Sequence, residues 1–397
     1  LTGAIPVFMQ PDYDSDWQMA HGVSPATVSV CLQQHPDAKA VLIVSPTYYG
    51  VCSDVASIAQ ITHQYRIPLL VDEAHGAHFG FHPDLPASAL ATGADLAVQS
   101  THKTLSAFTQ AAMLHVQGNR IDRTRLDRAL QLVQSTSPNY LLLASLDAAR
   151  QQMALEGKAL MHTTLQLADQ ARLQIDQIPG LRVFSPEHVE SRSARFRLDR
   201  TRLTVDVTGL GLTGFQADEI LHEQLGITAE LPSLQHLTFI ISLGNTVEDI
   251  DRLVQACKTL AEQHHQEFVK HPAARTHAVE SQLFSETSPT ETSNRVQNPK
   301  SKIQNPKSKI APSLTPRAAF FSSWETVPIA EAIDQISAEV VCPYPPGIPI
   351  LFPGERITAA AIQQLQTILQ AGGQVTGGGD SELKTLKIIQ ASSRNLD

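Results

Sequence analysis

Two short apolar runs, each followed at once by ionisable side chains, constrain the fold of this chain more than any other feature. Residues 68–71 (Pro-Leu-Leu-Val) lead into an acid, Asp72, and residues 95–99 lead into a four-residue segment that ends at Lys103. A short apolar run bounded in this way indicates a strand buried in a parallel sheet. In open α/β sheets the binding site lies beyond the carboxyl ends of the strands. We therefore expect Asp72 and Lys103 at the same edge of one sheet.

The segments around these runs predict strands and helices in alternation. Ser24 and Pro25 combine a capping hydroxyl with a proline at the first helical position, so we expect a helix to about Gln34. A second helix, capped by Ser53 or Asp54, is expected to run to about Tyr65, and strands are expected over 40–44 and 111–116. Strand, helix and parallel strand in this order form a βαβ unit, whose crossover is right-handed by default.

The rest of the chain predicts one long helix and further α+β regions. Residues 141–178 are helical in pattern and poor in helix breakers, Gly157 excepted, and such a helix commonly links a large domain to a small one. The other expected elements are strands at 4–8, 181–184, 202–207, 226–229, 237–241, 339–342 and 383–389, and helices at 122–133, 215–225, 247–263, 327–336 and 357–369.

The composition changes between residues 271 and 316, where apolar residues are few and Ser, Thr, Pro, Asn and Lys are frequent. A heptapeptide, Gln-Asn-Pro-Lys-Ser-Lys-Ile, occurs there twice in tandem, at 297–303 and 304–310. Two copies are too few for a solenoid, and proline breaks helices. We interpret this segment as a disordered linker; the functional alternative is a basic docking peptide.

Composition excludes several classes of function. Of 397 residues 42% are hydrophobic and 17% charged, which is typical of a soluble globular protein. The net charge of −9 argues against a nucleic-acid partner and mildly favours cationic substrates. The four cysteines are scattered without a CxxC pair, so we expect reduced thiols and no metal site. We expect a cytoplasmic protein, because no membrane span and no secretory signal is visible.

An acid and a lysine at neighbouring strand ends, with His75, His78 and His102 around them, suit one chemistry. The lysine amine holds an aldehyde cofactor as a Schiff base, and the acid keeps the ring nitrogen of the cofactor protonated. The alternatives are an exposed surface lysine at position 103 and an acid at position 72 that caps the next turn.

Four segments in order resemble one enzyme family. They are Asp72–His78, Ser100–Lys103, Ser135–Tyr140, and Pro343–Pro349 with the following Pro353-Gly354-Glu355. Together they resemble the fold-type I enzymes that depend on pyridoxal 5'-phosphate (PLP), and within these the ornithine, lysine and arginine decarboxylases. The resemblance covers most of the chain apart from the linker.

The resemblance implies an α/β fold class and four regions. Residues 1–150 are expected to be the remainder of the PLP-binding large domain, with a mostly parallel sheet. Residues 151–270 are expected to hold the long helix and a small α+β domain, residues 271–316 the linker, and residues 317–397 a C-terminal α+β decarboxylase domain. In the family a Gly/Ser/Thr-rich phosphate-binding turn and a ring-stacking histidine precede the sheet. This sequence contains neither, so we expect an N-terminally truncated large domain.

The resemblance also assigns residues to the cofactor. Lys103 is expected to carry PLP, and Asp72 to bind the pyridinium nitrogen. Ala74 is expected to face the ring, where a larger side chain would collide with it. Ser100 and His102 are expected to bind the phosphate, because hydroxyl and imidazole groups donate hydrogen bonds to its oxygens.

Further residues are expected to act on the substrate or across subunits. His75 is expected to be catalytic and to bond the phenolic oxygen of the cofactor or the substrate carboxylate. Ser137 resembles the position that reaches the phosphate of the neighbouring subunit, which implies a homodimer or a larger homo-oligomer with shared active sites. Glu355, and more weakly Glu230, are candidates to bind the distal cation of the substrate.

The expected function is α-decarboxylation of arginine, lysine or ornithine to an amine used in polyamine metabolism. One alternative is another fold-type I PLP enzyme such as an aminotransferase. The other is a non-catalytic or impaired truncated homologue. The Asp-Glu-Ala-His sequence at 72–75 also spells the Walker B motif of some helicases. No GxxxxGK[ST] loop accompanies it, so we do not expect ATP binding.

Overall fold

The structure is a computed structural model that describes residues 4–192, 196–270, 314–344 and 347–390. The chain divides into two compact units. The sheet unit comprises residues 9–206 and 238–261, and the C-terminal unit comprises residues 207–237, those described from 262 onward, and residues 4–8. Each is described by itself. No helix among the described residues combines the length and the apolar character needed to cross a membrane.

A four-stranded sheet with the order β3-β5-β6-β7 forms the centre of the sheet unit. The strands span Val41–Val44 (β3), Leu69–Asp72 (β5), Leu96–Gln99 (β6) and Met113–Val116 (β7). The first three are parallel, and β7 runs antiparallel to β6. The mostly parallel sheet predicted from the apolar runs is therefore confirmed.

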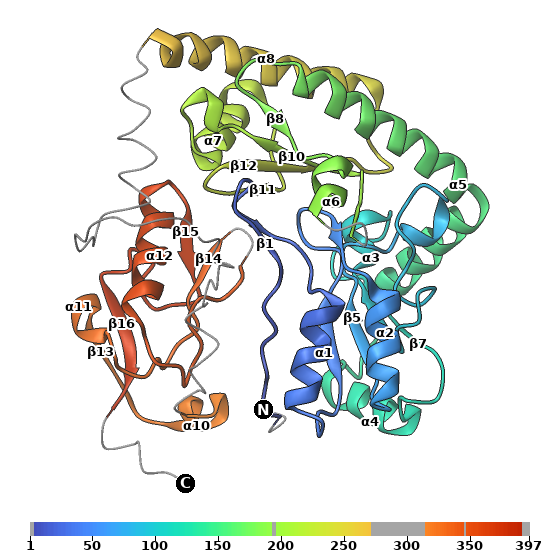
Figure 1. The fold of residues 1–397 in the computed structure, drawn as a ribbon, viewed down its shortest axis with the longest axis vertical. Coiled ribbons are helices and arrows are strands. Elements are labelled where there is room, and N and C mark those ends of the chain that lie inside the picture. Colours follow the sequence, from blue (N-terminus) through green and yellow to red (C-terminus); the bar gives the residue numbers. More distant parts are fainter. Residues whose placement is uncertain (1–3, 193–195, 271–313, 345–346, 391–397) are drawn as a thin grey trace, which may run out of the picture. The chain divides into compact units, whose positions relative to one another are not determined.

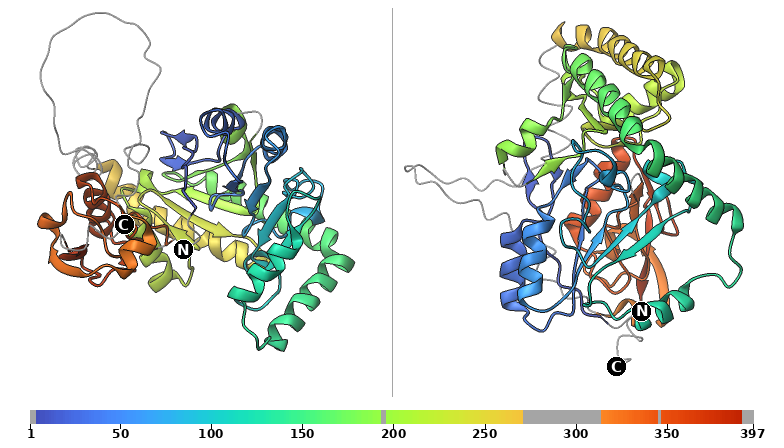
Figure 2. Two further views of the ribbon diagram at one scale, coloured as in Figure 1. Left: turned by 90° about the horizontal axis from the view of Figure 1, so that it is seen from below. Right: turned by 90° about the vertical axis from the view of Figure 1, so that its right-hand side faces the viewer.

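Two helices, α1 (Pro25–Gln34) and α2 (Val55–Gln64), cover one face of this sheet (Figures 1 and 2). Their starts follow from capping: Ser24 Oγ accepts from Thr27 N at 3.3 Å, and Asp54 Oδ1 accepts from Ser57 N at 3.0 Å. Each such cap is worth about 1 kcal/mol. The core between helices and sheet contains the buried side chains Val28, Leu32, Val41, Ile43, Val55, Ile58, Leu69 and Val71.

The predicted long helix is α5 (Tyr140–Asp176), 37 residues in length. Asn139 caps it by accepting from Leu141 N and Leu142 N. Gly157, the residue expected to weaken it, has a packing reason. A Cβ at this position would meet Phe81 Cδ1 at 3.0 Å, so the missing side chain makes room for the short helix η1 (Phe79–Phe81).

A second sheet follows the long helix. β8 (Arg182–Val183) pairs antiparallel with β10 (Arg202–Asp206), and β12 (His236–Ile240) lies on the other side of β10. Every residue of β10 is buried, including its first residue, Arg202. The smaller elements of the sheet unit are β1 (Tyr13–Asp14), β2 (Met19–Ala20), β4 (Val51–Cys52), α3 (Thr101–Thr104), α4 (Arg123–Val133), α6 (Pro186–Arg192) and β9 (Arg197–Leu198), and α8 (Val247–Lys270) begins in it.

The described part of the C-terminal unit combines two short antiparallel strand pairs with several helices. The pair of β13 (Trp324–Pro328) and β16 (Thr385–Ile389) and the pair of β14 (Cys342–Tyr344) and β15 (Gln374–Thr376) share a core with α12 (Ala359–Gln370). The buried members include Val341, Leu351, Ile357, Leu365, Val375, Leu386 and Ile388. Its remaining elements are η2 (Thr208–Leu210), α7 (Gly214–Leu225), β11 (Leu231–Pro232), α10 (Pro316–Phe321) and α11 (Ile329–Ala332).

Several sequence expectations for local structure are wrong. Residues 4–8 form no strand, and Ile5 and Phe8 are 90% and 63% exposed, because no neighbouring strand pairs with them there. The helix expected at 327–336 is only α11, since residues up to Pro328 pair with β16. The strand expected at 339–342 begins only at Cys342. The predicted linker at 271–316 lies outside the described residues apart from its last three.

Candidate active site

The two predicted strand ends lie next to each other. β5 ends at Asp72 and β6 at Gln99, and Asp72 is the register partner of Val98 across this parallel pair. One residue after β6, helix α3 begins, and it carries Lys103. The Asp72 carboxylate accepts a hydrogen bond from Ala74 N at 3.0 Å, which turns the chain away from the strand. The acid and the lysine therefore occupy the same edge of the sheet.

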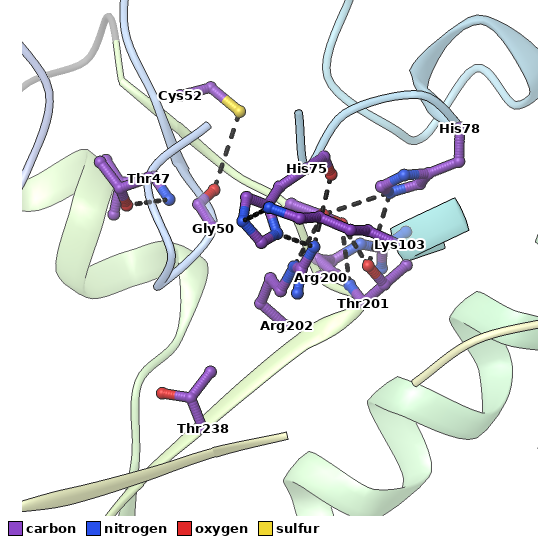
Figure 3. Close-up of polar contacts among 12 residues, drawn as sticks. Thr47, Gly50, Cys52, His75, His78, Lys103, Arg200, Thr201, Arg202 and Thr238 are labelled. Atoms are coloured by element: carbon purple, nitrogen blue, oxygen red, sulfur yellow. Dashed lines mark hydrogen bonds and ion pairs between the residues drawn. The ribbon is translucent and has the colours of Figure 1, made fainter. Parts of the chain in front are cut away.

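Lys103 is the first member of a chain of polar contacts that runs inward from this edge (Figure 3). Its Nζ lies 3.2 Å from His75 Nε2. The other ring nitrogen, His75 Nδ1, lies 3.0 Å from Arg202 Nη2, which also donates to His75 O at 3.4 Å. The imidazole thus lies between an amine and a guanidinium.

Aromatic packing and burial complete the surroundings of His75, which is 4% exposed. Tyr48, from the loop after β3, packs on the imidazole with ring centroids 4.3 Å apart and an interplanar angle of 57°. Burial and the positive charges of Arg202 and Lys103 lower the pKa of His75 to about 3. The ring is therefore neutral at neutral pH.

A buried anion lies behind this chain of contacts. Asp199 is 0% exposed, and its Oδ2 lies 3.2 Å from His78 Nε2 and 3.7 Å from Arg202 Nε. Its Oδ1 accepts from both the backbone N–H and the hydroxyl of Thr201. Burial alone would raise the pKa of Asp199, but His78, Arg202 and Thr201 together lower it to about 2.

A second buried acid, Glu73, lies in different surroundings. It accepts from Ala89 N at 2.7 Å and from Gln99 Nε2 at 2.7 Å, and Gln99 Oε1 lies 3.0 Å from His115 Nε2. Burial raises the pKa of Glu73 to about 7, although the two hydrogen bonds oppose the shift. With this pKa the Glu73 carboxyl is at least partly protonated at neutral pH. Through Gln99 and His115 it connects the ends of β5, β6 and β7.

The residues expected at the phosphate lie around α3. Ser100 precedes the helix and is half-buried. His102 Nδ1 lies 2.8 Å from Ala111 O, and because a carbonyl only accepts, this nitrogen carries a hydrogen. His102 Nε2 can then donate to an anion only when the ring is a cation. Ser137 lies exposed in the loop before α5, where Ser135 Oγ contacts its backbone.

The two acids expected to bind the substrate belong to the C-terminal unit. Glu355 accepts from Phe352 N at 3.3 Å within a turn at Gly354, whose φ is +90°. Glu230 is exposed, and residues 226–229 before it form no strand, contrary to expectation. The cluster around Lys103 is built from residues of the sheet unit.

Sequence reasoning missed Arg202, Asp199 and Thr201. Their segment, Asp-Arg-Thr-Arg, leads into the strand Arg-Leu-Thr-Val-Asp, and an arginine beside the apolar residues of a strand is a signal of a buried partner. Nothing in the sequence identifies that partner as His75, which lies 127 residues earlier.

The residue types at this edge fit PLP. The amine of Lys103 suits the aldehyde, the carboxylate of Asp72 suits the pyridinium nitrogen, and the groups at Ser100 and His102 suit a phosphate. The neutral imidazole of His75, 3.2 Å from Lys103 Nζ, supplies a polar group beside the amine that would hold the aldehyde. Among the described residues no group of three or more His, Cys, Asp or Glu side chains is placed to hold a metal ion.

Comparison of the sequence with protein families gives two matches. The major domain of the Orn/Lys/Arg decarboxylases matches residues 1–249, and the C-terminal domain of the same enzymes matches residues 295–394. Arginine decarboxylase of Bacillus subtilis is 37% identical over 390 residues, which are 98% of this chain and 74% of that protein. Lysine decarboxylase LdcA of Pseudomonas aeruginosa is 25% identical over 91% of this chain and 58% of its own length.

Solved structures give the same fold. The lysine decarboxylase of Francisella novicida superposes with a TM-score of 0.73 at 20% identity, covering 97% of this chain and 63% of that chain. The constitutive lysine decarboxylase of Escherichia coli superposes with a TM-score of 0.70 at 18% identity, covering 97% and 64%. The chain thus spans a little under two thirds of the lysine decarboxylases whose fold it shares.

Proposed function

The chain belongs to the Orn/Lys/Arg decarboxylase family, of PLP fold-type I, and from this premise we propose that it removes the α-carboxylate of a basic amino acid. PLP, when bound, supplies the electron sink that accepts the electron pair of the broken Cα–carboxylate bond. The protein must then hold the cofactor, orient the substrate and return a proton to Cα.

In this proposal the residues at the strand ends divide the work. Lys103 carries the cofactor through its amine and afterwards delivers a proton to Cα. Asp72 keeps the ring nitrogen protonated, through a charge-assisted hydrogen bond worth roughly 1.5–3 kcal/mol. His75 bonds the phenolic oxygen or the substrate carboxylate. Ala74 leaves room for the ring.

The observation that carries the proposal is the position of Lys103. Its Nζ lies 3.2 Å from a buried, neutral His75, and its helix follows the strand next to the one that ends at Asp72. A lysine amine attacks an aldehyde only when it is unprotonated, so a neutral and largely dry neighbour suits its task. A solvent-exposed surface lysine needs no buried imidazole beside its amine.

We propose arginine as the preferred substrate, with lysine and ornithine as the alternatives. The support is the 36–37% identity to arginine decarboxylases of Bacillus species over 98% of this chain, against 24–25% to lysine decarboxylases. Glu355, with Glu230 as the weaker candidate, is proposed to receive the distal cation. We further propose a homodimer or larger homo-oligomer in the cytoplasm, with Ser137 reaching the phosphate held by the neighbouring subunit.

The test combines a spectrum with an assay of products. Purified protein mixed with PLP is expected to develop the visible absorbance of lysine-bound PLP, which borohydride bleaches. Arginine, lysine and ornithine are then supplied separately, and agmatine, cadaverine and putrescine are resolved by chromatography. Agmatine as the main product supports the proposal, and a keto acid in place of an amine would indicate a transaminase.

Two variants make the assay specific. Lys103→Ala is expected to lose both the absorbance and the product, whereas Lys158→Ala removes an exposed lysine of α5 and should change neither. If the unaltered chain neither develops the absorbance nor forms an amine, the proposed activity is wrong for this chain.

A further inference from the structure

Arg202 stands out among the residues that the proposed function leaves without a task. It is 1% exposed, lies at the start of β10, and places Nη2 3.0 Å from His75 Nδ1. Burial of a guanidinium costs free energy of folding unless its charge is paired and its N–H groups are hydrogen-bonded. Asp199 balances its charge from the other side, with Oδ2 at 3.7 Å from Nε.

The backbone around Arg202 is shaped to hold it in this place. Gly50 has a φ of +87°, and a Cβ there would meet Arg202 Cγ at 2.8 Å and Asp199 O at 3.0 Å. Arg172 Nη2 donates to Arg202 O at 2.8 Å, and Arg202 N donates to Asp199 O at 3.0 Å. The room left by Gly50, the main-chain hydrogen bonds and the charge of Asp199 together direct the guanidinium of Arg202 toward the imidazole of His75.

The hydrogens of the imidazole follow from its two neighbours. A guanidinium has only donors and keeps its charge in proteins, so the contact with Arg202 is a hydrogen bond only if His75 Nδ1 is an acceptor. A neutral imidazole with an acceptor at Nδ1 carries its one hydrogen on Nε2. That hydrogen faces Lys103 Nζ at 3.2 Å.

The contact between His75 Nε2–H and Lys103 Nζ is a hydrogen bond only when Lys103 is the unprotonated amine, which is also the form that attacks an aldehyde. An ammonium group has no lone pair to accept from Nε2–H, whereas an unprotonated amine has one. Of the two basic neighbours of His75, only lysine readily loses its proton, so the arginine determines which ring nitrogen accepts. The reactive amine and the imidazole are thereby matched as acceptor and donor.

We propose that Arg202 is a positioning residue that holds His75 in the neutral form with its hydrogen on Nε2, directed at Lys103. The inference deepens the proposed function, on which it rests for the tasks of Lys103 and His75. In the proposed function, His75 donates a hydrogen bond to the cofactor oxygen or to the substrate carboxylate. The contact with Arg202 explains why the donor is Nε2. Besides Arg202 and Lys103, the charged or titratable groups near the ring are Tyr48, His78 and Asp199.

The test reads the ring nitrogens of His75 directly, by NMR of protein that contains isotope-labelled histidine and no cofactor. The spectrum of His75→Gln identifies the signals. In the unaltered chain at neutral pH, His75 is expected as a single neutral form with the hydrogen on Nε2. A hydrogen on Nδ1, or a cationic ring, would overturn the proposal whatever the variants do.

Arg202→Met is expected to lose this single form, giving a mixture of the two neutral forms and cation, because Nδ1 no longer has a donor. Arg202→Lys, which retains a cationic donor, should restore part of the Nε2–H signal. Arg120→Met is the matched control, since it also removes a guanidinium from a buried aspartate, Asp95 at 3.2 Å, away from His75. A folded Arg202→Met protein whose His75 stays wholly in the Nε2–H form would also overturn the proposal.

This readout is independent of the proposed function. If the unaltered chain forms no amine from any basic amino acid but His75 carries its hydrogen on Nε2 and loses that form in Arg202→Met, the proposed activity fails and the positioning role remains. If amine forms and the ring form is unchanged in Arg202→Met, the reverse holds.

Discussion

Two buried carboxylates of the sheet unit, Glu73 and Asp199, are equally hidden from solvent and behave in opposite ways. They are 2% and 0% exposed. The pKa of Glu73 is raised to about 7, and that of Asp199 is lowered to about 2. Glu73 faces a backbone amide and Gln99, whereas Asp199 faces His78 and Arg202. Burial sets the cost of a charge, and the partner decides whether the charge remains.

The opposite pKa shifts reflect different roles: the network of Glu73 is structural, and that of Asp199 lies beside the candidate active site. The Glu73 network joins β5, β6 and β7 through neutral hydrogen bonds and requires no counter-charge. The Asp199 network balances the guanidinium that contacts His75. We therefore expect the charge to be dispensable at position 73 and required at position 199.

The largest effect is expected from Asp199→Asn, which removes the anion but keeps an oxygen for Thr201. Arg202 would then lie buried without its counter-charge, a loss of about 3–5 kcal/mol in the free energy of unfolding. Urea denaturation measures it. A loss under about 1 kcal/mol would mean that the charge at 199 is no more important than that at 73.

The second prediction concerns pH and Glu73→Gln. The pKa of Glu73 is higher in the folded than in the unfolded chain, so its stabilising contribution is full below the ordinary value of 4.5 and is lost as pH rises through about 7. Glutamine mimics the protonated acid and has no such loss. The free energy of unfolding of Glu73→Gln, relative to that of the unaltered chain, should therefore rise by about 2 kcal/mol between roughly pH 5 and pH 8.

For Asp199 the sign is reversed. Its folded pKa is below its ordinary value of 3.8, so its contribution is present above 3.8 and is lost as pH falls toward 2. Unfolding of the unaltered chain followed over both pH windows should show both slopes. A flat difference between Glu73→Gln and the unaltered chain from mildly acidic to mildly basic pH would contradict the assignment of Glu73.

The third prediction tests the space reserved for Arg202. Gly50→Ala adds a Cβ that would lie 2.8 Å from Arg202 Cγ at a φ of +87°, so it should cost about 2 kcal/mol. Gly80→Ala is the control, because nothing lies within 4 Å of its Cβ and its φ is not positive. Thermal unfolding compares the two, and equal melting temperatures would show that Arg202 has room to move.

The smallest effect is expected from Thr201→Val, which keeps the shape of the side chain and removes its hydroxyl. Asp199 loses one hydrogen bond of 2.7 Å but keeps that from Thr201 N. The expected loss is about 1 kcal/mol by urea denaturation. A loss as large as that of Asp199→Asn would assign the stability of the network to its hydroxyl and not to its charges.

The two networks also differ in how far the sequence predicts them. Asp72, Glu73 and Lys103 follow apolar runs, and adjacent parallel strands bring such run ends together, so this edge of the sheet could be predicted. The contact between Arg202 and His75 joins residues 127 positions apart, and no local pattern encodes it. The role of Asp199 as the buried anion beside Arg202 follows only from the three-dimensional structure.

Similar reasons account for the local errors. The helix expected at 327–336 starts with residues whose apolar pattern also suits a strand, and β16, far along the chain, takes them into a sheet. Caps, by contrast, act within a few residues, which is why the start of α1 at Ser24 was predicted and that of α2 was narrowed to Ser53 or Asp54, of which Asp54 is the cap.

The most direct test of the account is the position of the lysine that carries PLP. Protein incubated with PLP is reduced with borohydride, digested, and mapped by mass spectrometry. The account predicts one pyridoxyl phosphate adduct, on the peptide that contains Lys103, and its loss in Lys103→Ala. An adduct confined to another lysine, or none at all, would contradict it.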